Sequence, residues 1–125
     1  MKTYDPMTEP PSAEWLDLDE AEQIDLVAAH HKQIRAKLPR PEVHAVVHVV
    51  VENQLAEGIA PARDALERLI ADGLDRHEAI HAISTVLLDH MQRIVRGEAT
   101  ELESHERYFQ ELKELTADKW LRSAD

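Results

Sequence analysis

Along most of the chain, apolar residues recur every three or four positions, which is the spacing of one face of an α-helix. Proline, glycine and capping residues interrupt this pattern at short connections. The first predicted helix begins at residue 12 or at residue 19 and ends at residue 38. The other four cover residues 41–57, 61–73, 76–96 and 101–121. No stretch has the alternation of a strand. We therefore expect an all-α protein, an antiparallel helical bundle of about five helices with short loops.

The N-terminal stretch MKTYDPMTEPP has no such period and contains three prolines. We expect residues 1–11 to form a disordered tail. The remainder, 12–125, has the length of one domain and can enclose one core. The sequence therefore predicts a single helical domain that follows a mobile tail.

The charge of the chain disfavours some classes of binding partner. The formal net charge is −11, and such a surface repels nucleic-acid backbones and anionic lipid. No segment is long and apolar enough to span a membrane, and the first residues do not resemble a signal peptide. The sequence has no cysteine, which excludes disulfides and thiolate metal ligands. We expect a cytoplasmic protein that binds neither nucleic acid nor membrane.

Eight histidines are an unusual feature of this composition. At about 100° of rotation per residue, five of them lie inside the apolar stripes of three predicted helices. They are His31, His44, His48, His77 and His81. His30 points towards the edge of its helix, whereas His90 and His105 lie at a stripe edge and in a charged run, where structural or solvated roles are expected.

A buried neutral imidazole needs a hydrogen-bond partner for both its donor and its acceptor. Burying five of them in one core without such partners therefore costs much free energy of folding. A metal ion removes this cost by taking the lone pairs, and residues four apart on a helix can reach one ion. The predicted metal ligands are His44, His48, His77, His81, Glu52 and His31. Imidazole does not by itself select a metal, and we expect a divalent transition ion, zinc or iron.

The stretch DRHEAIHAI, residues 75–83, contains the HExxH pattern of zinc peptidases. In those enzymes the glutamate acts as a base on metal-bound water, which would make Glu78 catalytic. Here a third ligand would have to come from upstream, and no strand is predicted to hold a peptide. Glu78 is therefore also a candidate ligand, a support for an imidazole, or a solvated residue.

Two known di-metal bundles resemble the chain in part. Like hemerythrin-like bundles, it has a core His31, HxxxE at His48 and Glu52, and HxxxH on a later helix. It departs from that family at His105, which is followed five residues later by Gln110 rather than by aspartate. Ferritin-like proteins use two ExxH pairs. Only one such pair, Glu78–His81, is present here.

The stretches VHAVVHVVVENQLAEG and GLDRHEAIHAISTVL resemble a third family more closely. It is an uncharacterised bacterial family, the domain of unknown function 1841, whose pattern is HxxxHxxxExQ followed by HEAxH. The matching positions are His44, His48, Glu52, Gln54, His77, Glu78 and His81. The resemblance covers about 40 residues and implies that the two histidine-bearing helices form one functional unit.

Three functions remain open from the sequence. The first is a metal-dependent enzyme, hydrolytic or oxidative, with Glu78 as proton acceptor. The second is a metal-binding protein whose ion is structural or sensed. The third is a non-enzymatic interaction protein, a homodimer whose core histidines form a polar network without metal. We expect self-association, and no small-molecule substrate can be named from the residues.

Overall fold

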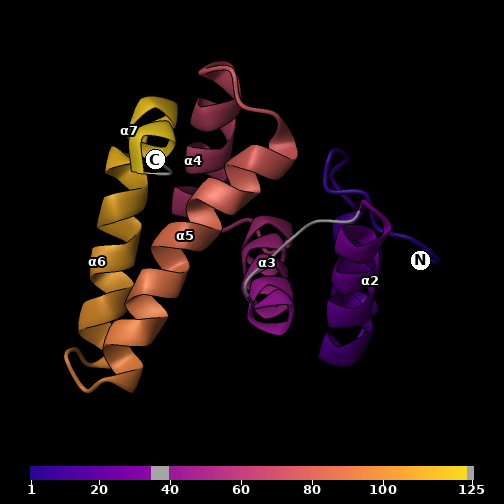
Figure 1. Cartoon of the computed structure of the whole chain (residues 1–125), viewed down its shortest axis with the longest axis horizontal. Coiled ribbons are helices and arrows are strands. Elements are labelled where there is room, and N and C mark those ends of the chain that lie inside the picture. Colours follow the sequence, from indigo (N-terminus) through magenta and orange to yellow (C-terminus); the bar gives the residue numbers. More distant parts are fainter. Residues whose placement is uncertain (35–39, 124–125) are drawn as a thin grey trace.

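The computed structural model describes residues 1–34 and 40–123, and this part of the chain forms seven α-helices without a strand. The helices are α1 (Ser12–Asp17), α2 (Glu20–Gln33), α3 (Pro41–Ala56), α4 (Ala60–Ala71), α5 (Arg76–Val95), α6 (Glu101–Glu114) and α7 (Ala117–Ser123). They pack against one another as a bundle (Figure 1). The prediction of an all-α helical bundle is confirmed.

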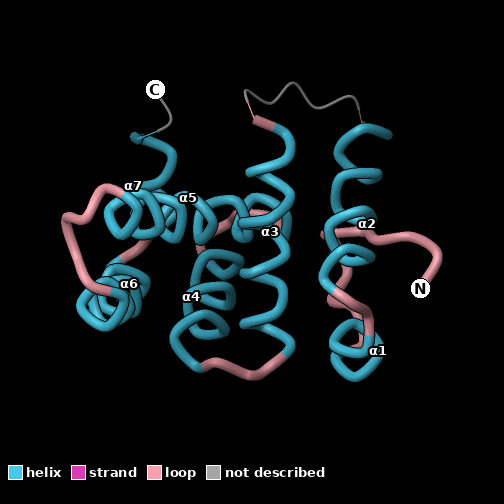
Figure 2. The backbone as a smooth tube through the Cα atoms, turned by 90° about the horizontal axis from the view of Figure 1, so that it is seen from below, coloured by secondary structure: helices cyan, strands magenta, loops and turns pink. Residues whose placement is uncertain are grey.

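Helix α3 occupies the centre of the bundle and packs against α2 on one side and α5 on the other (Figures 1 and 2). Helices α5 and α6 form an antiparallel pair on the far side of α3 from α2. Helix α4 contacts both members of this pair, and α7 contacts α5. Side chains on α2, α3 and α5 can therefore meet in the middle of the molecule.

Capping residues set the helix boundaries much as the sequence predicts. Asp19 accepts a hydrogen bond from the backbone of Glu22 in a capping box that starts α2. Pro41 occupies the first turn of α3, where its missing N–H costs nothing. Gly58 follows α3 with a φ of 72°, a conformation that glycine adopts without strain.

Two predicted helices are each divided in the structure. The first is interrupted at Leu18, whose extended backbone separates α1 from the cap of α2; its predicted end at Leu38 lies outside the described residues. The last is interrupted after α6, where Leu115 is extended. There the guanidinium of Arg68 on α4 donates hydrogen bonds to the carbonyls of Leu112 and Leu115, which satisfies the helix end.

The segment before α1 packs against the bundle, although the sequence analysis expected a disordered tail. Tyr4 is 5% exposed, and Pro6 is fully buried. The ring of Tyr4 contacts Trp15, and the backbone carbonyl of Pro6 accepts a hydrogen bond from Arg76 on α5. The segment has no helical period because it is held by individual side chains rather than by a repeating apolar face.

In the described residues, two apolar clusters make up the core. The larger joins α3 to α4, α5 and α6 and includes Leu55, Leu69, Ile80 and Leu112. The smaller lies on the other side of α3 and contains Tyr4, Trp15, Val27, Ala45 and Val49. Across the described residues, no helix has both the length and the apolar character needed to cross a bilayer.

Candidate metal centre

Histidines from α2, α3 and α5 converge at the centre of the bundle. Ring nitrogens of His31, His44, His48 and His81 all lie within 4.8 Å of one another. His31 and His48 are buried, and His44 and His81 are half-buried. This buried group could hold a metal ion, because each member offers one nitrogen to a common point.

Three of these nitrogens form a closed triangle. The Nε2 atom of His44 lies 3.1 Å from that of His31 and 3.0 Å from that of His81. The third side, from His31 to His81, is 3.5 Å. Zinc binds imidazole nitrogen at about 2.0–2.1 Å, so two nitrogens on one tetrahedral ion lie about 3.3 Å apart. The triangle therefore has the dimensions of one face of the tetrahedron that four nitrogen ligands form around zinc.

Hydrogen bonds alone do not satisfy this arrangement, and His31 shows why. Its Nδ1 lies 2.8 Å from the carbonyl oxygen of Val27, which can only accept, so Nδ1 carries the proton. Burial lowers the pKa of His31 and keeps the ring neutral, which leaves a single lone pair on Nε2. The Nε2 atoms of His44, His77 and His81 all lie within 3.5 Å of His31 Nε2, whose lone pair can accept only one hydrogen bond.

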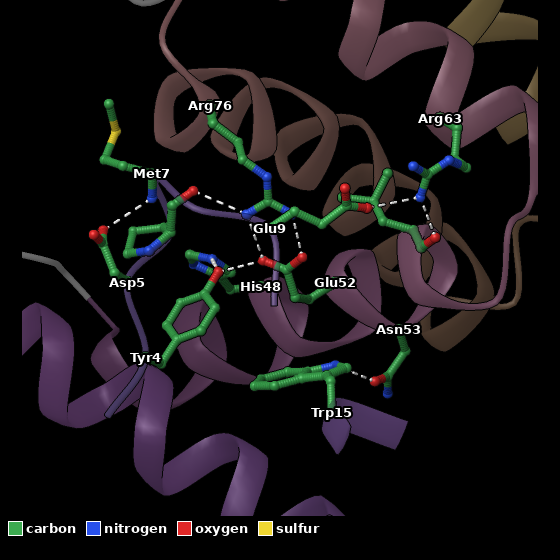
Figure 3. Close-up of polar contacts among 12 residues, drawn as sticks. Tyr4, Asp5, Met7, Glu9, Trp15, His48, Glu52, Asn53, Arg63 and Arg76 are labelled. Atoms are coloured by element: carbon green, nitrogen blue, oxygen red, sulfur yellow. Dashed lines mark hydrogen bonds and ion pairs between the residues drawn. The ribbon is translucent and has the colours of Figure 1, made fainter. Parts of the chain in front are cut away.

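His48 presents a second lone pair, and Tyr4 fixes which ring nitrogen carries it. The Tyr4 hydroxyl touches both Glu52 and His48 Nε2, the latter at 2.8 Å (Figure 3). The carboxylate can only accept, so the tyrosine proton goes to Glu52 and the tyrosine oxygen accepts from His48 Nε2. His48 Nδ1 is then unprotonated. It is fully buried and has no hydrogen-bond partner among the residues that the structure describes.

Glu52 is held by Arg76 rather than placed among the converging nitrogens. Both carboxylate oxygens accept hydrogen bonds from the guanidinium, with Arg76 Nη1 at 3.1 Å from Oε2 (Figure 3). Glu52 is 1% exposed and Arg76 is 8% exposed, so each charge depends on the other. Glu52, which the sequence predicts as a ligand, instead supports His48 through Tyr4.

The buried imidazoles are electrically neutral at physiological pH. Burial, reinforced by neighbouring histidines, lowers the pKa of His81 to about 3 and those of His44 and His77 to about 4. Burial also lowers the pKa of His48 well below its usual value. Metal ions bind the unprotonated form of histidine, so these rings are ready to ligate without first losing a proton.

The remaining predicted residues lie around this group. His77 Nε2 is 3.2 Å from His31 Nε2, and its ring centroid is 4.1 Å from that of His81, but it is not among the four mutually close nitrogens. Glu78 accepts a hydrogen bond from the backbone N–H of Asp75 at 3.1 Å in the capping box that starts α5. This cap accounts for the glutamate of HExxH, and its catalytic role stays a prediction.

The other histidines lie outside the converging group. The ring of His30 is half-buried and contacts the ring of His77. His90 is buried, and its Nε2 lies 3.1 Å from Glu111. His105 is exposed beside Phe109.

Tyr4 and Arg76 are the residues that the sequence analysis did not assign to the site. Tyr4 lies in a segment without periodicity, and no spacing rule relates it to His48. Arg76 immediately precedes His77, yet nothing in the sequence pairs it with Glu52 on another helix. The capping role of Glu78 did have a signal, because Asp75 stands three residues before it.

The Glu52–Arg76 pair gives the first testable prediction. Replacing Glu52 with glutamine leaves the Arg76 charge buried without a counter-charge. We expect the free energy of unfolding of metal-free protein to fall by about 3–5 kcal/mol. Urea denaturation in the presence of a chelator, followed by circular dichroism, measures this change.

Asp118→Asn is the matched control, since it makes the same acid-to-amide change in an ion pair with Arg122 whose side chains are 71% and 79% exposed. Its effect should be within about 0.5 kcal/mol. Equal stabilities of the two variants would contradict the assignment of Glu52 and Arg76 as a buried pair.

Comparisons with protein-family models, with curated proteins and with solved structures gave no match. The resemblance to the domain of unknown function 1841 stays a prediction.

Proposed function

We propose that this protein binds one divalent transition-metal ion, zinc or iron, through His31, His44, His48 and His81. The observation that carries the proposal is the pair of lone pairs fixed on His31 Nε2 and His48 Nδ1, on two of the four histidines that each have a ring nitrogen within 4.8 Å of the others. Hydrogen bonds among the described residues leave the lone pair of His48 Nδ1 without a donor, and only one of the three Nε2 atoms near His31 Nε2 can donate to it. An ion would accept both of these lone pairs.

A second candidate function is metal-dependent catalysis, either hydrolytic with zinc or oxidative with iron. It is favoured by a cavity of about 330 Å³ that reaches His44 and His81, so the ligand group is not enclosed on that side. A closed site with four protein ligands is structural, so this second candidate requires the ion to take a fifth ligand from the cavity beside His44 and His81. When bound, the ion would act as a Lewis acid towards a molecule in this cavity.

Elemental analysis of protein purified without chelator tests the proposal. We expect about one zinc or iron ion per chain, removed by dialysis against a chelator and restored by adding the ion back. Protein that contains no metal and binds none on titration calorimetry would overturn the proposal. The histidines would then form the polar network that the sequence left open.

Tyr4 gives a sharper test of how the site is held. Tyr4→Phe removes the oxygen that accepts from His48 Nε2, so the ring loses the partner that fixes its tautomer. We expect zinc affinity to fall about 10–100-fold, with one ion still bound at saturation. Competition with a chromophoric chelator measures the affinity.

Tyr108→Phe is the matched control, because Tyr108 is also buried and donates a hydrogen bond to Gln54 at 2.8 Å, away from the histidine group. It should leave zinc affinity unchanged. A Tyr4→Phe protein with the affinity of the parent would show that His48 does not depend on this hydroxyl.

A further inference from the structure

The cavity beside His44 and His81 is lined by both apolar and polar side chains. Val47 on α3, Leu88 on α5 and Trp120 on α7 form its apolar wall, and the polar lining is His44, His81, Ser84 and Thr85. Its volume of about 330 Å³ is at the lower limit of small-molecule pockets. A small ligand with a short apolar body fits these dimensions.

The charge balance around the proposed ion indicates what its head group must be. Four neutral imidazoles leave the full charge of a divalent ion uncompensated in a partly buried site. Glu52 does not offset it, because Arg76 neutralises that carboxylate. Among the described residues, no aspartate, glutamate, lysine or arginine lines the cavity. An outside anion would therefore be strongly favoured at the ion, as a fifth ligand beside the four imidazoles.

The hydroxyl group of Ser84 is an independent indication that a hydrogen-bond partner is missing. The residue is 8% exposed, and within the described part of the chain its buried hydroxyl oxygen has no hydrogen-bond partner. Buried hydroxyls in native proteins are nearly always satisfied. Ser84 lines the same cavity, close in sequence to His81 on α5, so a rotation of its side chain would let a ligand in the cavity accept its hydrogen bond.

We propose that the cavity binds a small monocarboxylate whose head group meets the ion and Ser84, and whose apolar tail lies against Val47, Leu88 and Trp120. This inference rests on the metal site proposed above. A carboxylate supplies the negative charge that the ion lacks and an acceptor for the serine hydroxyl. Burial of the tail against the uncharged wall adds a hydrophobic contribution to the binding free energy.

The test uses the full chain loaded with Co²⁺, whose visible absorption responds to a change of ligand. The metal content is measured first. Hexanoate is then titrated, with acetate as the carboxylate that lacks the longer tail and hexylammonium as the tail with the opposite charge. We expect hexanoate to change the spectrum at a concentration about tenfold or more below acetate. Hexylammonium should cause no change.

Two variants separate the contributions of the cavity. Leu88→Trp fills the apolar wall without changing a histidine, and should raise the half-saturating hexanoate concentration at least tenfold while leaving the acetate response unchanged. Ser84→Ala removes the unpaired hydroxyl, and should weaken both carboxylates severalfold. Circular dichroism confirms the fold of each, and either variant alone tests the proposal.

The two proposals fail in different ways. A chain that does not retain Co²⁺ overturns the metal site and the carboxylate site together. Bound Co²⁺ with no spectral response to hexanoate overturns the carboxylate site alone. Equal half-saturating concentrations of hexanoate and acetate would likewise exclude the apolar cavity as the place where the tail binds.

Discussion

A His81→Ala variant will lose most of its affinity for zinc. His81 supplies one corner of the nitrogen triangle, at 3.0 Å from His44, and the neighbouring His77 lies outside the mutually close group. The loss should exceed the roughly 10–100-fold that residues supporting a ligand contribute. Protein purified in parallel with the parent, and analysed for metal content and for affinity by chelator competition, measures the effect.

Two other histidine variants make this result specific. His77→Ala should retain the ion with a smaller loss of affinity, because His77 adjoins His31 but is outside the mutually close group. His105→Ala, on the exposed face of α6, should bind as the parent does. If His81→Ala and His105→Ala contain equal amounts of metal, His81 is not a ligand.

The histidine group could be anticipated because helical periodicity is a local property. Once α2, α3 and α5 are recognised as helices, rotation of about 100° per residue places His31, His44 and His81 on buried faces. The packing of those three helices then brings the faces together. The sequence alone did not separate His77 from the closer group, since His77 and His81 share a helix face and differ only in how α5 is placed against α2.

The supporting residues could not be anticipated, because they depend on contacts between distant segments. The Tyr4 hydroxyl reaches His48 across 44 positions of the chain, from a segment with no regular structure. The guanidinium of Arg76 reaches Glu52 from a different helix. Glu52 looked like a ligand because HxxxE spacing places it one turn from His48. Only its pairing with Arg76 shows that its charge is already compensated.

Metal-free protein should lose stability steeply as the pH falls from about 6.5 to about 4. Burial, the largest cause, lowers the pKa values of His44 and His77 to about 4. The ordinary value in an unfolded chain is about 6.5. In this interval the unfolded chain binds protons that the folded protein excludes. Acid therefore favours unfolding, and the contribution of these neutral rings is complete above pH 6.5.

The size of the effect follows from proton linkage. Each histidine that is protonated only on unfolding adds up to about 1.4 kcal/mol per pH unit to the loss of stability. Urea denaturation of chelator-treated protein at a series of pH values gives the slope. His44→Gln keeps a polar side chain but cannot take up the proton. The slope of its free energy of unfolding against pH, between pH 4 and 6.5, should therefore be smaller by about the contribution of one proton. An unchanged slope in that variant would show that His44 is not held neutral by the fold. The lone pair proposed to meet the ion would then be protonated in mild acid even without unfolding.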